Sequence, residues 1–242
     1  MNYKLENAES YTNKTILYIH GWNSKLETME VLSCCNDKYN LLFIDLPGCG
    51  KTNEPKTPLK YEDYLEKITN LTNFLNLKIC FIVTHSFGGK LAIGLSEKYD
   101  TLQGLFLICP SIIKPRRTIK YYFKIYTYKL CKKLKLLKYF KANRFGSVDY
   151  QNASDVMKKT LINILNINLE EKLKNIDLPT ILLWAKDDQE TKINLAKKAH
   201  KLLKNSSLIV IDGPHFAYYF QARYVTKILI SFIKGVEKDD NC

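Results

Sequence analysis

The chain has 242 residues, of which 46% are hydrophobic and 25% are charged. This length suits one well-packed domain, and the composition is typical of a globular protein and excludes an intrinsically disordered one. The net charge of +13 comes from a single segment, because Lys114 to Arg144 contain twelve basic residues and no acidic one, and the rest of the chain carries only +1.

Six short apolar runs predict the strands of a sheet. They span residues 15–19, 41–44, 79–83, 104–108, 180–184 and 207–211. Continuous apolar runs are typical of strands that are buried on both faces, as in a parallel sheet. Helix-length segments lie between them, at residues 61–76, 87–99, 192–204 and 217–234. This alternation predicts an α/β fold with a mostly parallel, doubly wound sheet and helices on both faces.

The alternation stops between the fourth and fifth predicted strands. Residues 111–175 contain no strand-like run, and apolar residues from Ile119 to Leu137 recur at steps of three and four, with lysines on most other faces. That spacing is typical of amphipathic helices. We therefore expect a core made of residues 1–110 and 176–242, with residues 111–175 inserted as a helical cap at one end of the sheet.

Several features bear on the compartment and on cofactors. The first fourteen residues are polar and lack the apolar core of a signal peptide, and no apolar run approaches the ~20 residues that span a bilayer. The seven cysteines form neither a disulfide framework nor a CxxC metal pattern. We expect a soluble, cytoplasmic protein with reduced thiols, no metal and no cofactor.

The densest motif is Val83-Thr-His-Ser-Phe-Gly-Gly89. A predicted strand runs directly into Ser86, and a predicted helix begins immediately after it. A sharp turn of this kind exposes the serine hydroxyl, and the helix N-terminus favours developing negative charge. A glycine such as Gly88 lets the strand and the helix approach closely. The motif indicates a nucleophilic serine, with a merely structural strand-to-helix turn as the alternative.

Two further motifs follow the first and second predicted strands. His20-Gly21-Trp22 comes after the first, and Asp45-Leu-Pro-Gly-Cys-Gly-Lys-Thr52 comes after the second. The latter loosely matches a phosphate-binding loop. The full spacing fails, because Asp45 stands where that loop needs its first glycine. We therefore reject nucleotide binding.

A carboxylate and a histidine follow the last two predicted strands. Trp184-Ala-Lys-Asp-Asp188 ends one strand, and Gly213-Pro-His215 follows the other. The carboxyl ends of parallel strands meet at one edge of a sheet, so we expect these residues to lie near Ser86. A lone histidine is more often structural than catalytic, but the order serine, aspartate, histidine is that of one known triad fold.

Together these motifs resemble those of the α/β-hydrolase fold family, in its serine hydrolase or esterase branch and among its small bacterial members with a helical cap. The resemblance covers about residues 13–110 and 176–234. Two positions depart from the family pattern. Thr84 replaces the first glycine of G-x-S-x-G, and Ala185 replaces the glycine of W-G-x-x-D.

The resemblance implies a role for each site residue. Ser86 would be the nucleophile, His215 the base and Asp188, rather than Asp187, the acid that orients it. The backbone N–H groups of Trp22 and Phe87 would form the oxyanion hole. His20, Gly21 and Gly88 would support that loop and turn. His85 is assigned a packing role and His200 a surface position.

The implied reaction is hydrolysis of a carboxylic ester or thioester through an acyl-enzyme. Dehalogenase and epoxide hydrolase chemistry in this family needs a carboxylate at the position of Ser86, which argues against both. Hydrolysis of carbon–carbon bonds and hydroxynitrile lyase chemistry use the same triad and stay open. A non-catalytic binding protein on the same scaffold is a further alternative, because fold does not fix function.

The basic segment permits three interpretations of the cap. It could be an ordinary lid over a small ester or thioester, with aromatic residues facing the pocket and lysines in water. It could dock an acidic partner such as an acyl carrier protein, or adhere to an anionic membrane surface. We do not expect nucleic acid as a partner, because nearly all the basic residues are lysine and few are the arginine suited to base-edge contacts.

Overall fold

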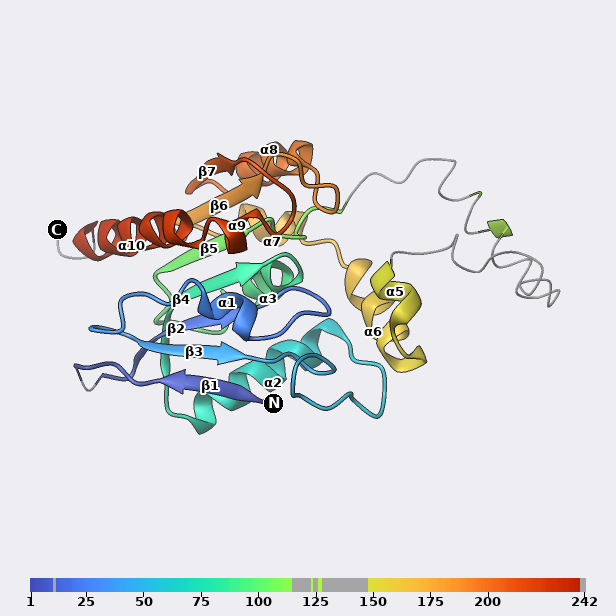
Figure 1. The fold of residues 1–242 in the computed structure, drawn as a ribbon, viewed down its shortest axis with the longest axis horizontal. Coiled ribbons are helices and arrows are strands. Elements are labelled where there is room, and N and C mark those ends of the chain that lie inside the picture. Colours follow the sequence, from blue (N-terminus) through green and yellow to red (C-terminus); the bar gives the residue numbers. More distant parts are fainter. Residues whose placement is uncertain (11, 115–122, 124–125, 128–147, 240–242) are drawn as a thin grey trace.

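The computed structural model describes residues 1–10, 12–114, 123, 126–127 and 148–239. Its centre is a seven-stranded sheet in the order β1-β3-β2-β4-β5-β6-β7 (Figure 1). All pairings are parallel except the antiparallel pairing of β1 with β3. The strands are β1 (Tyr3–Glu6), β2 (Lys14–Ile19), β3 (Asn40–Ile44), β4 (Lys78–His85), β5 (Gly104–Ile108), β6 (Thr180–Ala185) and β7 (Ser206–Ile211).

The described helices connect and cover these strands. They are α1 (Glu27–Glu30), α2 (Tyr61–Phe74), α3 (Phe87–Leu95), α5 (Val148–Asn152), α6 (Asp155–Leu165), α7 (Glu170–Lys174), α8 (Ile193–Leu202), α9 (Ala217–Phe220) and α10 (Ala222–Asp239). No described helix combines the length and the apolar character needed to cross a membrane.

Helices lie on both faces of the sheet and make two apolar layers. One layer joins α2, α3 and α7 to the sheet, and the other joins α1, α9 and α10 to the opposite face. In α10, Val225, Leu229, Ile233 and Val236 are buried at steps of four, four and three residues, which places them on one side of the helix. The predicted doubly wound α/β sheet is confirmed.

The six predicted strands are present, each within two residues of its expected ends. The edge strand β1 was not predicted, because its residues are half-exposed or exposed and carry no apolar run. The helix predicted at residues 217–234 is instead two helices, α9 and α10, separated at Gln221. The Gln221 side chain donates to the Asp212 carbonyl at 2.7 Å, which ties this break to the loop before His215.

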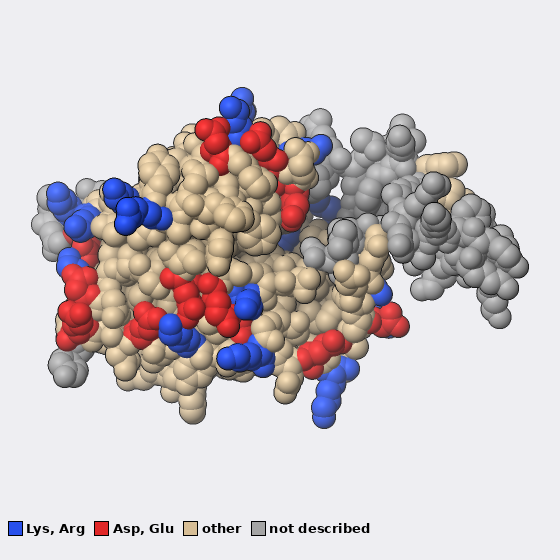
Figure 2. Space-filling model, in the orientation of Figure 1, with Lys and Arg blue, Asp and Glu red and all other residues tan. Residues whose placement is uncertain are grey.

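The predicted amphipathic helix between Ile119 and Leu137 lies outside the described residues except at 123 and 126–127, so the cap at 111–175 stays a prediction. Of that range, the structure describes α5, α6 and α7. Helix α6 is capped by Ser154, the residue before its first, whose side chain accepts a hydrogen bond from the Met157 N–H. On the face of the molecule in Figure 2, basic and acidic side chains are interspersed over the core.

Candidate active site

Ser86 lies at the turn between β4 and α3. Its backbone has φ 51° and ψ −109°, a conformation that costs about 1–3 kcal/mol for a residue other than glycine. Its N–H donates to the Ile108 carbonyl at 2.9 Å, and its own carbonyl accepts from Gly89 and Ser111. The neighbouring strand therefore holds the strained turn in place.

The glycines around this turn permit close approach of three segments. A Cβ on Gly88 would lie 2.6 Å from the Ile19 carbonyl oxygen, so no side chain fits there. A Cβ on Gly21 would lie 3.4 Å from the Cβ of Ser86. These contacts bring the loop after β2 against both the serine and the start of α3.

Thr84, which replaces a glycine of the family motif, is a regular residue of β4. It pairs with Ile19 on one side and with Leu107 on the other. The positive φ falls on Ser86, so the threonine takes no part in the turn. Its hydroxyl is buried and has no hydrogen-bond partner among the described residues.

Asp188 and His215 form a buried pair beyond the ends of β6 and β7. The Nδ1–H of His215 donates to Oδ2 of Asp188, with 2.6 Å between the two atoms. Burial alone would raise the pKa of the Asp188 carboxyl, but hydrogen bonds from His215 and Thr191 outweigh burial and bring it to about 2. Asp187, the alternative acid, is exposed. The aspartate that binds the histidine is therefore Asp188, as predicted.

Residues that follow Asp188 complete its hydrogen bonding and were not identified from the sequence. The backbone N–H groups of Glu190 and Thr191 donate to Oδ1 at 2.8 and 2.9 Å, and the Thr191 hydroxyl donates to Oδ2 at 2.7 Å. An aspartate followed by threonine three residues later is a local signal for such a turn. The carboxylate is thereby fixed in one orientation.

His85 connects the serine turn to the histidine loop. Its Nε2–H donates to the His215 carbonyl at 3.1 Å, and its ring packs against His215, Phe216 and Tyr218. Burial, followed by the charge of His215, lowers the pKa of His85 to about 3, so the ring is neutral. This residue therefore adds a hydrogen bond to the packing role expected for it.

The described residues contain no hydrogen bond between the Ser86 hydroxyl and His215. Instead, Nε2 of His215 lies 3.3 Å from a carboxylate oxygen of Glu190, whose side chain is 61% exposed. Hydrogen bonds between such groups are often absent before substrate binds. The pair Asp188–His215 is thus assembled, whereas the link from His215 to Ser86 is not formed in this structure.

A second histidine–aspartate pair, His20 and Asp45, lies after β2 and β3. The Leu46 N–H donates to Nε2 of His20 at 3.1 Å, so Nδ1 carries the proton and donates to the Gly21 carbonyl at 2.6 Å. Burial lowers the pKa of His20. One ring nitrogen therefore binds the backbone of the loop that contains Trp22, and the other binds the backbone of the loop after β3.

Trp22 and Phe87, the predicted oxyanion residues, are neighbours. Their ring centroids lie 5.2 Å apart in an edge-on arrangement. Phe87 is the first residue of α3, so its N–H is one that a helix leaves without an intrahelical acceptor. Phe87 directly follows Ser86 in the chain, and Trp22 directly follows Gly21, where a Cβ would lie 3.4 Å from that of Ser86.

One group of described residues has the composition of a metal site. Ligand atoms of Cys109, Asp188 and His215 lie within 4.8 Å of one another. Burial raises the pKa of the Cys109 thiol, whereas a metal needs the thiolate, and the Asp188–His215 hydrogen bond occupies the other two groups. The chemistry of these donors fits a hydrogen-bonded pair better than a metal centre.

Comparisons with known proteins identify the family of this chain. The model of the alpha/beta hydrolase family matches residues 16–226. The uncharacterized hydrolase YugF of Bacillus subtilis is 22% identical over 97% of this chain and 95% of that protein. A proline iminopeptidase of Saccharolobus solfataricus is 26% identical over 97% of this chain and 89% of that protein.

Solved structures show the same fold. An esterase from Exiguobacterium antarcticum superposes with a TM-score of 0.73 at 19% identity, over 96% of this chain and 94% of that one. The family match covers most of the sequence and includes every predicted site residue. The chain therefore belongs to the alpha/beta hydrolase family.

Proposed function

We propose that this protein is a serine hydrolase that cleaves a carboxylic ester or thioester through an acyl-enzyme. The observation that carries the proposal is the buried Asp188–His215 pair, with 2.6 Å between Nδ1 and Oδ2. The His215 carbonyl accepts a hydrogen bond from His85, the residue before Ser86, and Ser86 has a strained backbone at a helix N-terminus. The names of similar proteins include esterases, lipases and a peptidase, so the family alone leaves the bond type open.

The proposed reaction assigns one task to each group. The Ser86 oxygen attacks the carbonyl carbon while its proton passes to Nε2 of His215. The N–H groups of Trp22 and Phe87 donate to the oxygen that becomes negative. The bond to the alcohol or thiol then breaks, and the leaving atom takes the proton from His215. Water repeats the sequence on the acyl-enzyme and releases the acid.

Asp188 stabilises the charged imidazole that forms at each transfer. Its carboxylate accepts three further hydrogen bonds besides that of His215, so it stays ionised and fixed while the imidazole gains charge. Glu190 must leave Nε2 before the serine proton can reach it, and its exposed side chain is free to turn toward solvent.

We also propose that residues 111–175 form the cap of this enzyme. Helix α6 is attached to the loop after β3, because Thr160 accepts from the Leu59 N–H and Asn163 donates to the Leu59 carbonyl, each at 3.0 Å. A pocket of about 170 Å³ lies between Trp22 and α6. Docking of an acyl carrier protein or of a membrane concerns residues outside the described part and stays a prediction.

Ester hydrolysis by the wild type and by Ser86→Ala tests the proposal. We expect turnover of p-nitrophenyl esters and of a matched thioester, and a loss of at least 10³-fold in the variant. Ser96→Ala, a serine on the far end of α3, is the matched control and should keep its activity.

Turnover of an amide substrate, proline p-nitroanilide, measured beside the esters distinguishes peptidase from esterase activity. Faster turnover of the amide than of the esters would contradict ester specificity but keep the triad. No turnover of any substrate by well-folded protein would favour a binding protein on this scaffold.

A further inference from the structure

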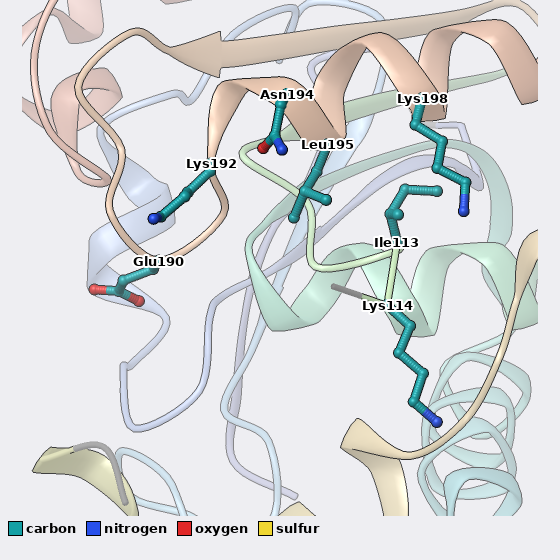
Figure 3. Close-up of a pocket in the computed structure, with 7 residues that line it drawn as sticks. All are labelled: Ile113, Lys114, Glu190, Lys192, Asn194, Leu195 and Lys198. Carbon is teal, nitrogen blue, oxygen red and sulfur yellow. The ribbon is translucent and has the colours of Figure 1, made fainter. Parts of the chain in front are cut away.

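A pocket of about 480 Å³ adjoins the proposed triad on the side of α8 (Figure 3). Two connections link it to the reacting groups. Glu190, which lines the pocket, lies 3.3 Å from Nε2 of His215. Ile113 and Lys114, on the opposite wall, follow Ser111, whose N–H donates to the Ser86 carbonyl at 2.9 Å. A pocket of this size accommodates a small organic group.

The lining residues divide this pocket by polarity. In the view of Figure 3, Glu190 and Lys192 lie at one end, Asn194 and Leu195 lie between, and Ile113 lies with Lys114 and Lys198 toward the other end. The end at Glu190 is the one next to His215. A molecule with its reacting atom at His215 would therefore extend past Leu195 and Ile113 toward two ammonium groups.

Among the residues that the structure describes, the charges at that far end are not balanced. Lys198 pairs with Glu170 at 2.6 Å, whereas the partner described for the Lys114 ammonium is the neutral Asn166 carbonyl, at 3.2 Å. Lys90 on α3 is 2% exposed and forms no ion pair with any described residue. Burial, and then the charge of Lys114, lowers the pKa of Lys90 to about 8.

The step that uses His215 decides which part of a substrate enters this pocket. In the proposed reaction the leaving oxygen or sulfur takes its proton from Nε2 of His215, the atom that Glu190 contacts. The group attached to that leaving atom therefore lies on the pocket side. The acyl group lies on the side of the oxyanion residues, where the smaller pocket beside Trp22 opens.

We propose that the pocket binds an anionic group, a carboxylate or a phosphate, on the alcohol or thiol part of the substrate, with Lys114 as its main partner. This inference rests on the proposed function, because the triad defines which end is the leaving group. The anion would supply the counter-charge that Lys114 lacks among the described residues, and Ile113 and Leu195 would contact the apolar spacer.

Butyrate esters with matched leaving groups test this proposal. One series uses para-hydroxybenzoate, the neutral para-hydroxybenzamide and para-hydroxyphenyl phosphate, and a second uses para-hydroxyphenylpropionate and its amide as longer spacers. The quantity compared is the ratio of wild-type to variant kcat/KM, in which the intrinsic reactivity of each ester cancels.

Lys114→Met removes the charge and keeps the length of the side chain. We expect it to lower kcat/KM on an anionic ester about tenfold more than on its neutral match, which corresponds to about 1.4 kcal/mol. Lys197→Met is the matched control, because Lys197 is exposed on α8, the helix that carries Leu195 and Lys198, and does not line the pocket. For Lys197→Met, the ratio of wild-type to variant kcat/KM on an anionic ester and the ratio on its neutral match should agree within about twofold, as for any exposed charge.

The outcomes distinguish which anion the pocket binds, and they test anion binding separately from hydrolase activity. An effect on the phosphate ester alone would identify phosphate as the group bound, and an effect on the carboxylates would identify carboxylate. Equal losses on charged and neutral esters, or the same ratios for Lys114→Met as for Lys197→Met, would overturn the inference while the hydrolase stands.

If the wild type hydrolyses none of these esters, the proposed function fails and calorimetry decides the binding site alone. The probes are para-hydroxybenzoate, para-hydroxybenzamide and para-hydroxyphenyl phosphate. Tighter binding of either anion than of the amide, lost in Lys114→Met and kept in Lys197→Met, would support the site. Equal binding of all three would overturn it.

Discussion

Two buried histidine–aspartate pairs lie at the same edge of the sheet, and they differ in what the second ring nitrogen does. In His20, one nitrogen accepts from the Leu46 N–H and the other donates to the Gly21 carbonyl, while Asp45 stands 3.9 Å away. In His215, Asp188 binds one nitrogen at 2.6 Å, and the other lies 3.3 Å from the exposed Glu190, the one partner that the described residues give it. A base needs a nitrogen that the fold leaves available, and of these two histidines His215 has one.

The aspartates differ in a corresponding way. Asp45 accepts from the Leu26 and Lys51 backbone N–H groups, each at 2.8 Å, and from the Asn2 side chain, so it joins three loops. Asp188 is held by its own turn and directs a full charge at His215. The first pair thus stabilises the architecture around the serine, and the second has the arrangement that the proposed proton transfer requires.

The largest effect is expected from Asp188→Asn. The amide keeps the shape of the carboxylate but removes the charge that stabilises the imidazolium and fixes its tautomer. We expect kcat on an ester to fall about 10³–10⁴-fold, with a smaller change in KM. Asp187→Asn is the matched control, and a loss of similar size in that variant would contradict the assignment of Asp188.

His20→Leu should affect stability more than chemistry. It leaves the Leu46 N–H and the Gly21 carbonyl buried without partners, and we expect the free energy of unfolding to fall by about 2–4 kcal/mol. Urea denaturation measures this change. Activity per folded molecule should fall far less than in Asp188→Asn, and a loss as large as in that variant would give His20 a direct part in catalysis.

The depressed pKa of His85 predicts acid sensitivity. Its pKa is about 3 in the folded chain and near 6.5 when unfolded, so between these values the unfolded state binds more protons. Stability is therefore fully present above about pH 6.5 and falls as the pH drops, with a slope of up to about 1.4 kcal/mol per pH unit from this residue.

Denaturation of the wild type and of His85→Gln at several pH values measures that slope. The variant should show a shallower dependence between about pH 6 and pH 4, with the remainder due to His20 and other groups. Identical slopes in the two proteins would show that His85 is not buried in its neutral form.

The smallest effect is expected at Thr84. Its hydroxyl is buried without a partner, and valine has nearly the same shape without that group. We expect Thr84→Val to change the free energy of unfolding by about 1 kcal/mol or less, in the stabilising direction. A destabilisation above about 2 kcal/mol would mean that the hydroxyl has a partner in solution.

The sheet and the place of each candidate site residue after a strand were predictable because both depend on local signals. Apolar runs marked the six buried strands, and each site residue follows the end of one of them. The edge strand β1 carries no such signal, since it is paired on one side and half-exposed. The contact of Glu190 with His215 and the burial of Lys90 depend on which segments the fold brings together, and this cannot be predicted from residue type alone.

Labelling of Ser86 by a fluorophosphonate tests the central claim most directly, because it reports the reactivity of the serine without assuming a substrate. The rate would be measured in the wild type, His215→Leu and His20→Leu, with the labelled residue identified by mass spectrometry. We predict rapid labelling at Ser86 in the wild type, loss of at least 10³-fold in His215→Leu, and a far smaller loss in folded His20→Leu. Equal loss in the two histidine variants, or labelling at another serine, would contradict the assignment.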